Sequence, residues 1–275
     1  GKLMLGMSPS LLIWKRLFED KSNFNDDISS WDVSAVVNMK DLFNHATNFN
    51  QDLSSWDVSS VTNMHRLFAS SGFNGDISTW DVSSVTNFEE LFNNSIFNGD
   101  ISGWDLSSAE NMQFMFNNSI FSGDISEWNV SSVWMMGQVF ANSSFNGDIS
   151  AWDVSNVTRF EEMFYNSTFN GDISGWDVSN AQSMQSMFHS AVNFNQDLSN
   201  WDVSNVIDMH NMFYGCTNFN GDISQWDVSS VINMEAMFDN ALALTDMNKC
   251  AIHSSWSSNL NWPYDWSGFM YDSNK

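Results

Sequence analysis

Tryptophan recurs along most of this chain at a nearly constant spacing. It stands at positions 31, 56, 80, 104, 128, 152, 176, 201 and 226, so successive steps are 24 or 25 residues long. A fixed period of this length is typical of repeat architectures, in which a unit too short to enclose a core stacks on its neighbours. The spacing therefore predicts nine stacked units between Phe24 and Leu244.

Each unit combines two apolar patterns. Trp80 and Val82 alternate with polar residues, which predicts a short strand with one buried face. The apolar residues of the stretch 85–92 follow at steps of three, three and one, which predicts one or two helical turns, with Ser83 as the N-cap. We therefore expect a curved rod with stacked parallel strands on one side and short helices on the convex side.

The recurring spacing Ile/Leu-x-x-Trp-x-Val-x-x-Val-x-x-Met-x-x-Met-Phe resembles the BspA-like leucine-rich repeat, with Trp at a position usually held by an aliphatic residue. It is more similar still to the Trp-Asp-Val-Ser-x-Val variant of mycoplasma surface lipoproteins and of surface proteins of marine microbes. The stretches 248–253 and 262–266 also resemble that family's closing segment. The resemblance implies an α/β solenoid, a right-handed leucine-rich-repeat-like horseshoe with a concave parallel sheet, at a cell surface and without catalytic residues.

The domain organisation follows from where the repeat pattern starts and stops. Residues 1–23 are expected to form an N-terminal cap in which Trp14, Leu17 and Phe18 imitate half a unit. Residues 24–244 form the nine-repeat solenoid, and the aromatic-rich residues 245–275 form a C-terminal cap. Because an uncovered end of a stack exposes its core, we expect one continuous domain closed at both ends.

The charge balance excludes several classes of partner. The chain has 275 residues, with 9 Lys and Arg against 33 Asp and Glu, and a formal net charge of −24. Such a chain does not provide the positive surface that nucleic acids or anionic membranes require. No apolar run is long enough to span a bilayer. The start at Gly1 lacks a full signal-peptide pattern, so we expect a processed or excised chain.

A carboxylate follows the repeated Trp in eight of the nine units, and Asn129 takes its place in the remaining one. Like charges on adjacent strands repel each other, so this arrangement requires an explanation. Bridging cations, raised pKa values, a covering ligand, or hydrogen bonds from nearby Ser and backbone groups would each provide one. We call these residues the Trp-Asp row and predict them as the ligand-binding face: Asp32, Asp57, Asp81, Asp105, Asp153, Asp177, Asp202 and Asp227.

Calcium is the cation that would fit such a row best, because it prefers several oxygen ligands. Its candidate ligands are Asp81, Asp105, Asp153 and Asp177. No other cofactor is expected.

A second Asp row lies five residues earlier in each unit, within the Asn-Gly/Gln-Asp-Ile/Leu-Ser stretch. Asp and Asn in turns bond to their own backbone two residues on, which favours a structural role over calcium binding. The accompanying Asn residues are expected to form a stacked ladder. The second Asp row consists of Asp27, Asp52, Asp76, Asp100, Asp124, Asp148, Asp172, Asp197 and Asp222.

Most of the remaining conspicuous residues favour structural roles. The Trp and Met columns fall on inward positions and are expected in the core, whereas Trp134 breaks the pattern and is expected to be exposed. The five His lack metal-ligand spacing, and no nucleophile motif or phosphate loop occurs, so an enzyme is not expected. Cys216 stands where other units have Ala, which favours a small buried residue, although a disulfide with Cys250 stays open.

Several Asn-x-Ser/Thr motifs are candidates for glycosylation. We expect four of them to share one exposed link, where glycans would decorate one edge. They are Asn93, Asn117, Asn142 and Asn166.

Together these features predict a non-enzymatic extracellular or cell-surface module that binds a protein or glycan through the Trp-Asp row, with calcium as a candidate helper. The alternative is a structural subunit of an extracellular assembly or filament that self-associates through its regular faces.

Overall fold

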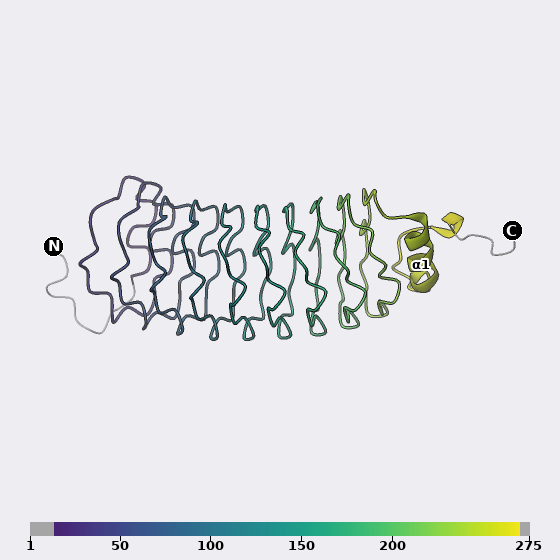
Figure 1. The fold of residues 1–275 in the computed structure, drawn as a ribbon, viewed down its shortest axis with the longest axis horizontal. Coiled ribbons are helices and arrows are strands. Elements are labelled where there is room, and N and C mark those ends of the chain that lie inside the picture. Colours follow the sequence, from purple (N-terminus) through teal and green to yellow (C-terminus); the bar gives the residue numbers. More distant parts are fainter. Residues whose placement is uncertain (1–13, 270–275) are drawn as a thin grey trace.

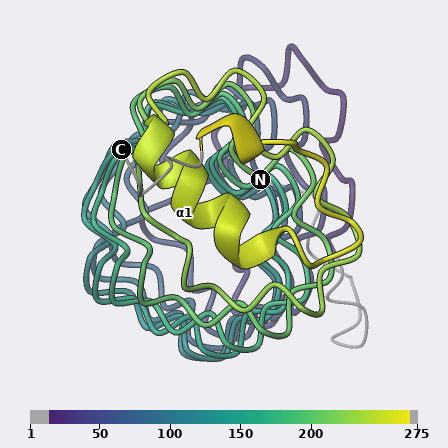
Figure 2. The ribbon, with the colours of Figure 1, turned by 90° about the vertical axis from the view of Figure 1, so that its right-hand side faces the viewer.

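The computed structural model describes residues 14–269, which form an elongated stack of coils (Figure 1). Each repeat unit makes one coil, and viewed along the stack the coils follow a common outline (Figure 2). Regular secondary structure is confined to α1 (Asp246–Trp256) and the 3-10 helix η1 (Ser267–Phe269), which lie together at the C-terminal end. None of the described helices is long and apolar enough to cross a membrane.

Parallel backbone bridges join each coil to the next. They form one column of eight bridges that runs from Asn38–Asn63 to Asp208–Asn233. We call the residues around this column the bridged segment, which spans residues 37–46 in the first coil and the corresponding residues in the others. Within it, the N–H groups of Met39, Asp41, Phe43 and His45 donate to carbonyls of the next coil over 2.8–3.0 Å.

The intervening N–H groups of the bridged segment bond within their own coil. The amide of Leu42 donates to the carbonyl of Met39, and the amide of Ala46 donates to the carbonyl of Phe43. Two residues per coil adopt a positive φ at the third position of these turns, as type II turns require. We call the first of the two positions the first αL column: Arg16, Asp41, Arg66, Glu90, Phe114, Gln138, Glu162, Ser186, Asn211 and Ala236.

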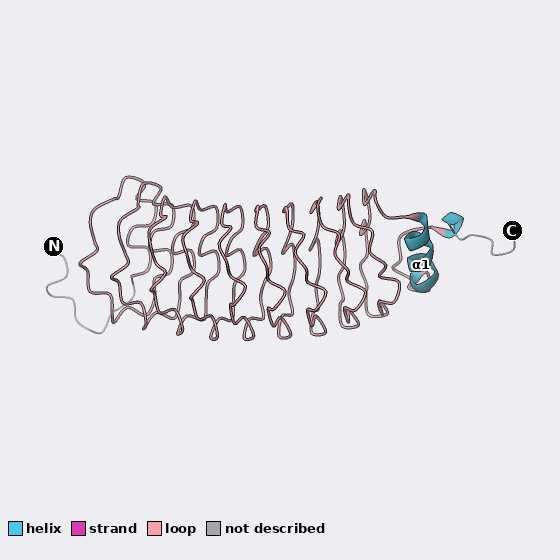
Figure 3. Cartoon of the chain, viewed as in Figure 1, coloured by secondary structure: helices cyan, strands magenta, loops and turns pink. Residues whose placement is uncertain are grey.

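This backbone differs from the predicted strand and helix. The described coils contain no helix before α1 and only isolated bridges, as Figure 3 shows. The Trp80–Val82 stretch forms no bridge and lies between two turns, in which the amide of Trp80 donates to the carbonyl of Ile77 and the amide of Val85 donates to the carbonyl of Val82. The bridge falls at Asn87, inside the predicted helix. Successive four-residue turns bury residues at steps of three and four, so they imitate the apolar pattern of a helix.

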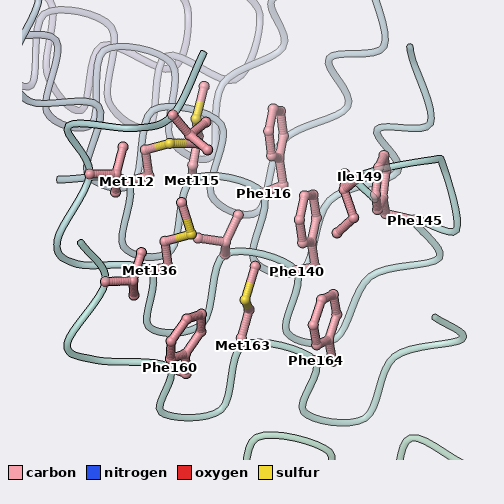
Figure 4. Packing of buried hydrophobic residues seen from close by; sticks show 14 of the residues in the cluster. Met112, Met115, Phe116, Met136, Phe140, Phe145, Ile149, Phe160, Met163 and Phe164 are labelled. Carbon is pink, nitrogen blue, oxygen red and sulfur yellow. The ribbon is translucent and has the colours of Figure 1, made fainter. Parts of the chain in front are cut away.

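Stacked aromatic rings fill the inside of the coils (Figure 4). Phe140 lies 5.8 Å from Phe116 on one side and 5.9 Å from Phe164 on the other, measured between ring centroids, and 4.2 Å from Phe145 of its own coil. Methionines such as Met136 fill the space beside them. Burying one such side chain contributes about 1.5–3 kcal/mol. The predicted Trp and Met core is therefore confirmed for the described coils.

The Trp column also ties neighbouring coils together. The indole Nε1 of Trp152, for example, donates to the carbonyl of Ile125 in the preceding coil over 3.0 Å. The same bond recurs from Trp56 to Trp226. Each Trp thus satisfies its only polar atom while its rings stay buried.

Both ends of the described stack carry aromatic side chains. At the N-terminal end Trp14 is buried and Phe18 stacks on Phe43 at 5.5 Å, whereas Leu17 is exposed. The part of the predicted cap before Trp14 lies outside the described residues. At the C-terminal end Trp256 of α1 stacks on Trp226 at 6.2 Å, and Trp262, Tyr264 and Trp266 gather around Phe238.

Candidate functional site

Each carboxylate of the Trp-Asp row is exposed and held in a local turn. In Asp57 the Oδ1 atom accepts the backbone N–H of Ser59 over 3.1 Å and its hydroxyl over 2.6 Å. The corresponding Ser amide donates to every other Asp of the row. Within the described residues Oδ2 accepts no hydrogen bond, so each carboxylate presents one oxygen to solvent.

Hydrogen bonding keeps these carboxylates ionised. The Ser59 hydroxyl and amide lower the pKa of Asp57, while the neighbouring charges of Asp81 and Asp32 raise it by a smaller amount. The pKa is lowered for the same reason at Asp32, Asp81, Asp105, Asp153, Asp177 and Asp227. Of the explanations for the row, raised pKa values are therefore wrong for these seven residues, and hydrogen bonding by Ser is confirmed.

Asn129 shows that the turn does not need the charge. Its Oδ1 accepts the N–H of Ser131 over 3.2 Å and the hydroxyl over 2.7 Å, which reproduces the contacts of Asp57. The fold therefore accounts for a side-chain oxygen at this position, but not for a carboxylate in eight coils out of nine.

The second Asp row has the predicted turn chemistry. Oδ1 of Asp76 accepts the N–H of Ser78 over 2.9 Å, and the other coils repeat this contact. Beside it runs the predicted Asn ladder, in which the backbone N–H of Asn98 donates to the side-chain Oδ1 of Asn74 over 2.8 Å. This ladder is interrupted where Ser122 replaces Asn, since a hydroxyl does not reach the next coil in the same way.

The described residues do not gather a metal site. No group of three or more His, Cys, Asp or Glu side chains comes together in residues 14–269. The calcium candidates Asp81, Asp105, Asp153 and Asp177 stand in separate coils with Oδ1 already bonded to Ser. Calcium takes six to eight oxygen ligands, which a single row of such carboxylates does not supply.

The cysteines are not paired. Cys216 and Cys250 are both free, and the thiol of Cys216 donates to the carbonyl of Ala191 over 3.1 Å. Burial raises the pKa of Cys216 to about 12. The small buried residue is the correct interpretation of Cys216, and the disulfide is excluded.

The four glycosylation candidates occupy two different positions, not one shared link. Asn142 and Asn166 are exposed, and the amide of Asn166 donates to Oδ1 of Asn142. Asn93 and Asn117 stand one residue earlier in their coils and are half-buried, with their amides bonded to Glu90 and Gln138. The expectation of a common exposed edge is therefore wrong for Asn93 and Asn117.

Sequence reasoning missed a set of polar and aromatic residues on the bridged segment. Arg66 donates to Glu90 of the next coil, with Nε 2.8 Å from Oε2. His189 stacks between Tyr165 and Tyr214, at centroid distances of 4.7 and 4.6 Å. These residue types do not recur in every coil, so the available signal was departure from the repeat. Trp134, which departs from it in the same way, is 41% exposed as expected.

Comparison with known proteins places the repeat in a family. No curated protein and no solved structure gives a significant match. The family described as "Mycoplasma protein of unknown function, DUF285" matches residues 12–98, 55–148, 94–191 and 141–256, which together span almost the whole chain. The overlapping matches agree with a repeated unit of the kind that the Trp spacing predicted. This protein therefore belongs to the DUF285 family of mycoplasma-type repeat proteins.

Proposed function

We propose that this protein is a non-enzymatic interaction module that binds a basic protein surface through the Trp-Asp row. The observation that carries the proposal is the row itself, in which ionised carboxylates recur once per coil with one oxygen free. A regular line of anionic oxygens complements Lys and Arg side chains, for which charge pairing gives fast and specific association. A glycan partner would have to use hydroxyl donors on the same oxygens.

The proposal includes a location outside the cell or on its surface. Its support is the resemblance of the Trp-Asp-Val-Ser-x-Val repeat to BspA-like leucine-rich repeats and to mycoplasma surface lipoproteins. The parallel bridges between successive coils agree with a repeat fold related to that class. Catalysis has no part in the proposal, because the repeated Ser and Asp residues bond to each other in every coil.

A scaffold role is the second candidate. It is favoured by exposed aliphatic side chains on adjacent coils of the bridged segment, where Ile207 and Ile232 are joined through their backbones at 2.9 Å. Two exposed aliphatic side chains on neighbouring coils suit side-by-side association. This alternative predicts oligomers that grow with concentration and dissociate when Ile207 and Ile232 are changed to Thr. A monomer at high concentration would contradict it.

The test of the main proposal compares two triple variants of equal charge. One changes Asp105, Asp153 and Asp177 to Asn, and the control changes Asp100, Asp148 and Asp172 of the second Asp row in the same coils. The probe is a short poly-L-lysine peptide, and binding is measured by biolayer interferometry. We expect the first variant to lose about tenfold in affinity, equivalent to about 1.4 kcal/mol, and the control to lose clearly less. Equal losses of affinity would mean that the Trp-Asp row acts only through the net charge of the chain, and they would overturn the proposal.

A further inference from the structure

Two of the three carboxylates in the first αL column are paired with an arginine from the preceding coil. Arg16 donates to Asp41 over 3.2 Å through Nε. Two coils later Arg66 donates to Glu90 through both Nε and an outer guanidinium nitrogen. The Glu90 side chain is only 14% exposed, so its charge needs this partner. The backbone geometry of the column therefore builds a site that fits one carboxylate and one guanidinium on adjacent coils.

Glu162 occupies the same column without an arginine. It has the same positive φ as Glu90, at 55° against 56°, and it is likewise half-buried. The preceding coil supplies Gln138, and the following coil supplies Ser186. Within residues 14–269 the Glu162 carboxylate makes no hydrogen bond or ion pair, while Gln138 Oε1 accepts from Asn117. Burial and the adjacent Glu161 raise the pKa of Glu162.

Tyr165 lies three residues after Glu162 in the same coil, and its backbone N–H donates to the Glu162 carbonyl over 3.0 Å. In the coil of Glu90 the corresponding residue is Asn93, whose side-chain amide donates to the Glu90 carboxylate over 3.0 Å. One face of Tyr165 stacks on His189. The residue in register on the preceding coil is Ala141, which is buried and carries no ring to stack on Tyr165. A guanidinium pairs with a carboxylate and stacks on an aromatic ring, and Glu162 and Tyr165 supply both groups within one turn.

We propose that Glu162 and Tyr165 form a binding site for an arginine side chain of a protein partner, which takes the place that Arg66 occupies beside Glu90. Arginine fits better than lysine because its planar fork pairs with both carboxylate oxygens and stacks on the ring. Glu161 adds negative charge, although Arg159 lies 3.8 Å from it. The site lies on the bridged segment and does not involve the Trp-Asp row, so it stands or falls separately from the proposed function.

The test uses two blocked tripeptides, Gly-Arg-Gly and Gly-Lys-Gly, titrated into the intact chain by calorimetry. We expect the arginine peptide to bind at least about tenfold more tightly than the lysine peptide. Glu162→Gln should weaken arginine binding by about tenfold or more, because it removes the charge and keeps the shape. Glu110→Gln is the matched control, since it removes an exposed carboxylate from the bridged segment two coils earlier, and it should leave binding unchanged.

A second variant fills the site from within. Gln138→Arg places an arginine where Arg66 stands relative to Glu90, and it should abolish peptide binding while raising the melting temperature. The melting-temperature gain should vanish in the double variant with Glu162→Gln. Equal binding of both peptides, an effect of Glu110→Gln equal to that of Glu162→Gln, or displacement of the arginine peptide by Ca²⁺ at stoichiometric concentration would overturn the proposal. Binding of free arginine without binding of the blocked peptide would overturn the assignment to a protein partner.

Discussion

The Trp-Asp row and the bridged segment differ in how constant their polar side chains are from coil to coil. On the Trp-Asp surface the same Asp–Ser contact recurs in coil after coil, with Asn129 as its single variation. On the bridged segment the backbone pattern recurs, but the first αL column changes from Arg66 to Glu90 to Phe114. The turns of the Trp-Asp surface therefore add a recurring side-chain bond to their backbone bonds, whereas in the first αL column only the backbone bonds recur and the side chains vary.

Asn129 separates the role of the side-chain oxygen in these turns from the role of its charge. Because it holds its Ser as Asp57 does, the fold explains the oxygen and not the charge. The turn therefore does not account for the charge of the Trp-Asp row, which is the feature on which the proposed function depends.

The largest expected effect lies in the core beneath the bridged segment. Phe140→Ala removes a ring that stacks on Phe116, Phe145 and Phe164, and we expect it to lower the free energy of unfolding by about 3–5 kcal/mol. Chemical denaturation would measure it. Trp134→Ala on the exposed side of the same coil is the control, with little expected loss. Similar losses for the two variants would contradict the division between buried and exposed sides.

Acid should weaken the Asp–Ser turns of the Trp-Asp row. The pKa of Asp57 and Asp81 is lowered in the folded chain from 3.8, so the unfolded chain binds more protons near that pH. Their stabilisation is present above about pH 4 and is lost as the pH falls through the folded pKa values. Melting temperatures measured at high salt, which screens the repulsion of a chain with charge −24, should fall below about pH 4. A melting temperature that is constant down to pH 3 would contradict the hydrogen-bonded account.

Removing the turn oxygen should matter more than removing its charge. Asp153→Ala deletes the acceptor for both the amide and the hydroxyl of Ser155, whereas Asp153→Asn keeps it. We expect a measurable drop in melting temperature for the Ala variant and almost none for the Asn variant at neutral pH. Equal drops would mean that the charge itself holds the turn, in disagreement with Asn129.

Calcium should produce the smallest effect. Because no three carboxylates of residues 14–269 converge, we expect Ca²⁺ and Mg²⁺ to change the melting temperature equally and slightly. Thermal melting with a chelator control tests this. A calcium-specific rise would show that neighbouring coils close around an ion, and it would restore the calcium hypothesis for Asp81 and Asp105.

The sequence was sufficient for the features that repeat. The stacked units, the Trp and Met core, the Asp–Ser turns and the Asn ladder all follow from periodic residues, because each recurring residue has the same neighbours in every coil. The secondary structure did not follow, since successive turns with positive φ bury Met39, Leu42 and Phe43 at the same steps as a helix.

The side-chain contacts between adjacent coils were also not predicted from the sequence. Whether Glu90 or Glu162 is paired depends on a residue 24 positions earlier, Arg66 or Gln138; the repeat period aligns these residues, but the positive-φ turns that bring their side chains together were not predicted. The stacking of Tyr165, His189 and Tyr214 depends on the same register.

The central claim is that the charge of the Trp-Asp row makes the contact and the turn does not. Asn129→Asp tests it most directly, because it joins two runs of four carboxylates into one continuous row without changing the shape of the turn. Binding of poly-L-lysine is measured beside the melting temperature at neutral pH. The account predicts tighter binding with an unchanged melting temperature, whereas unchanged or weaker binding at an unchanged melting temperature would contradict it.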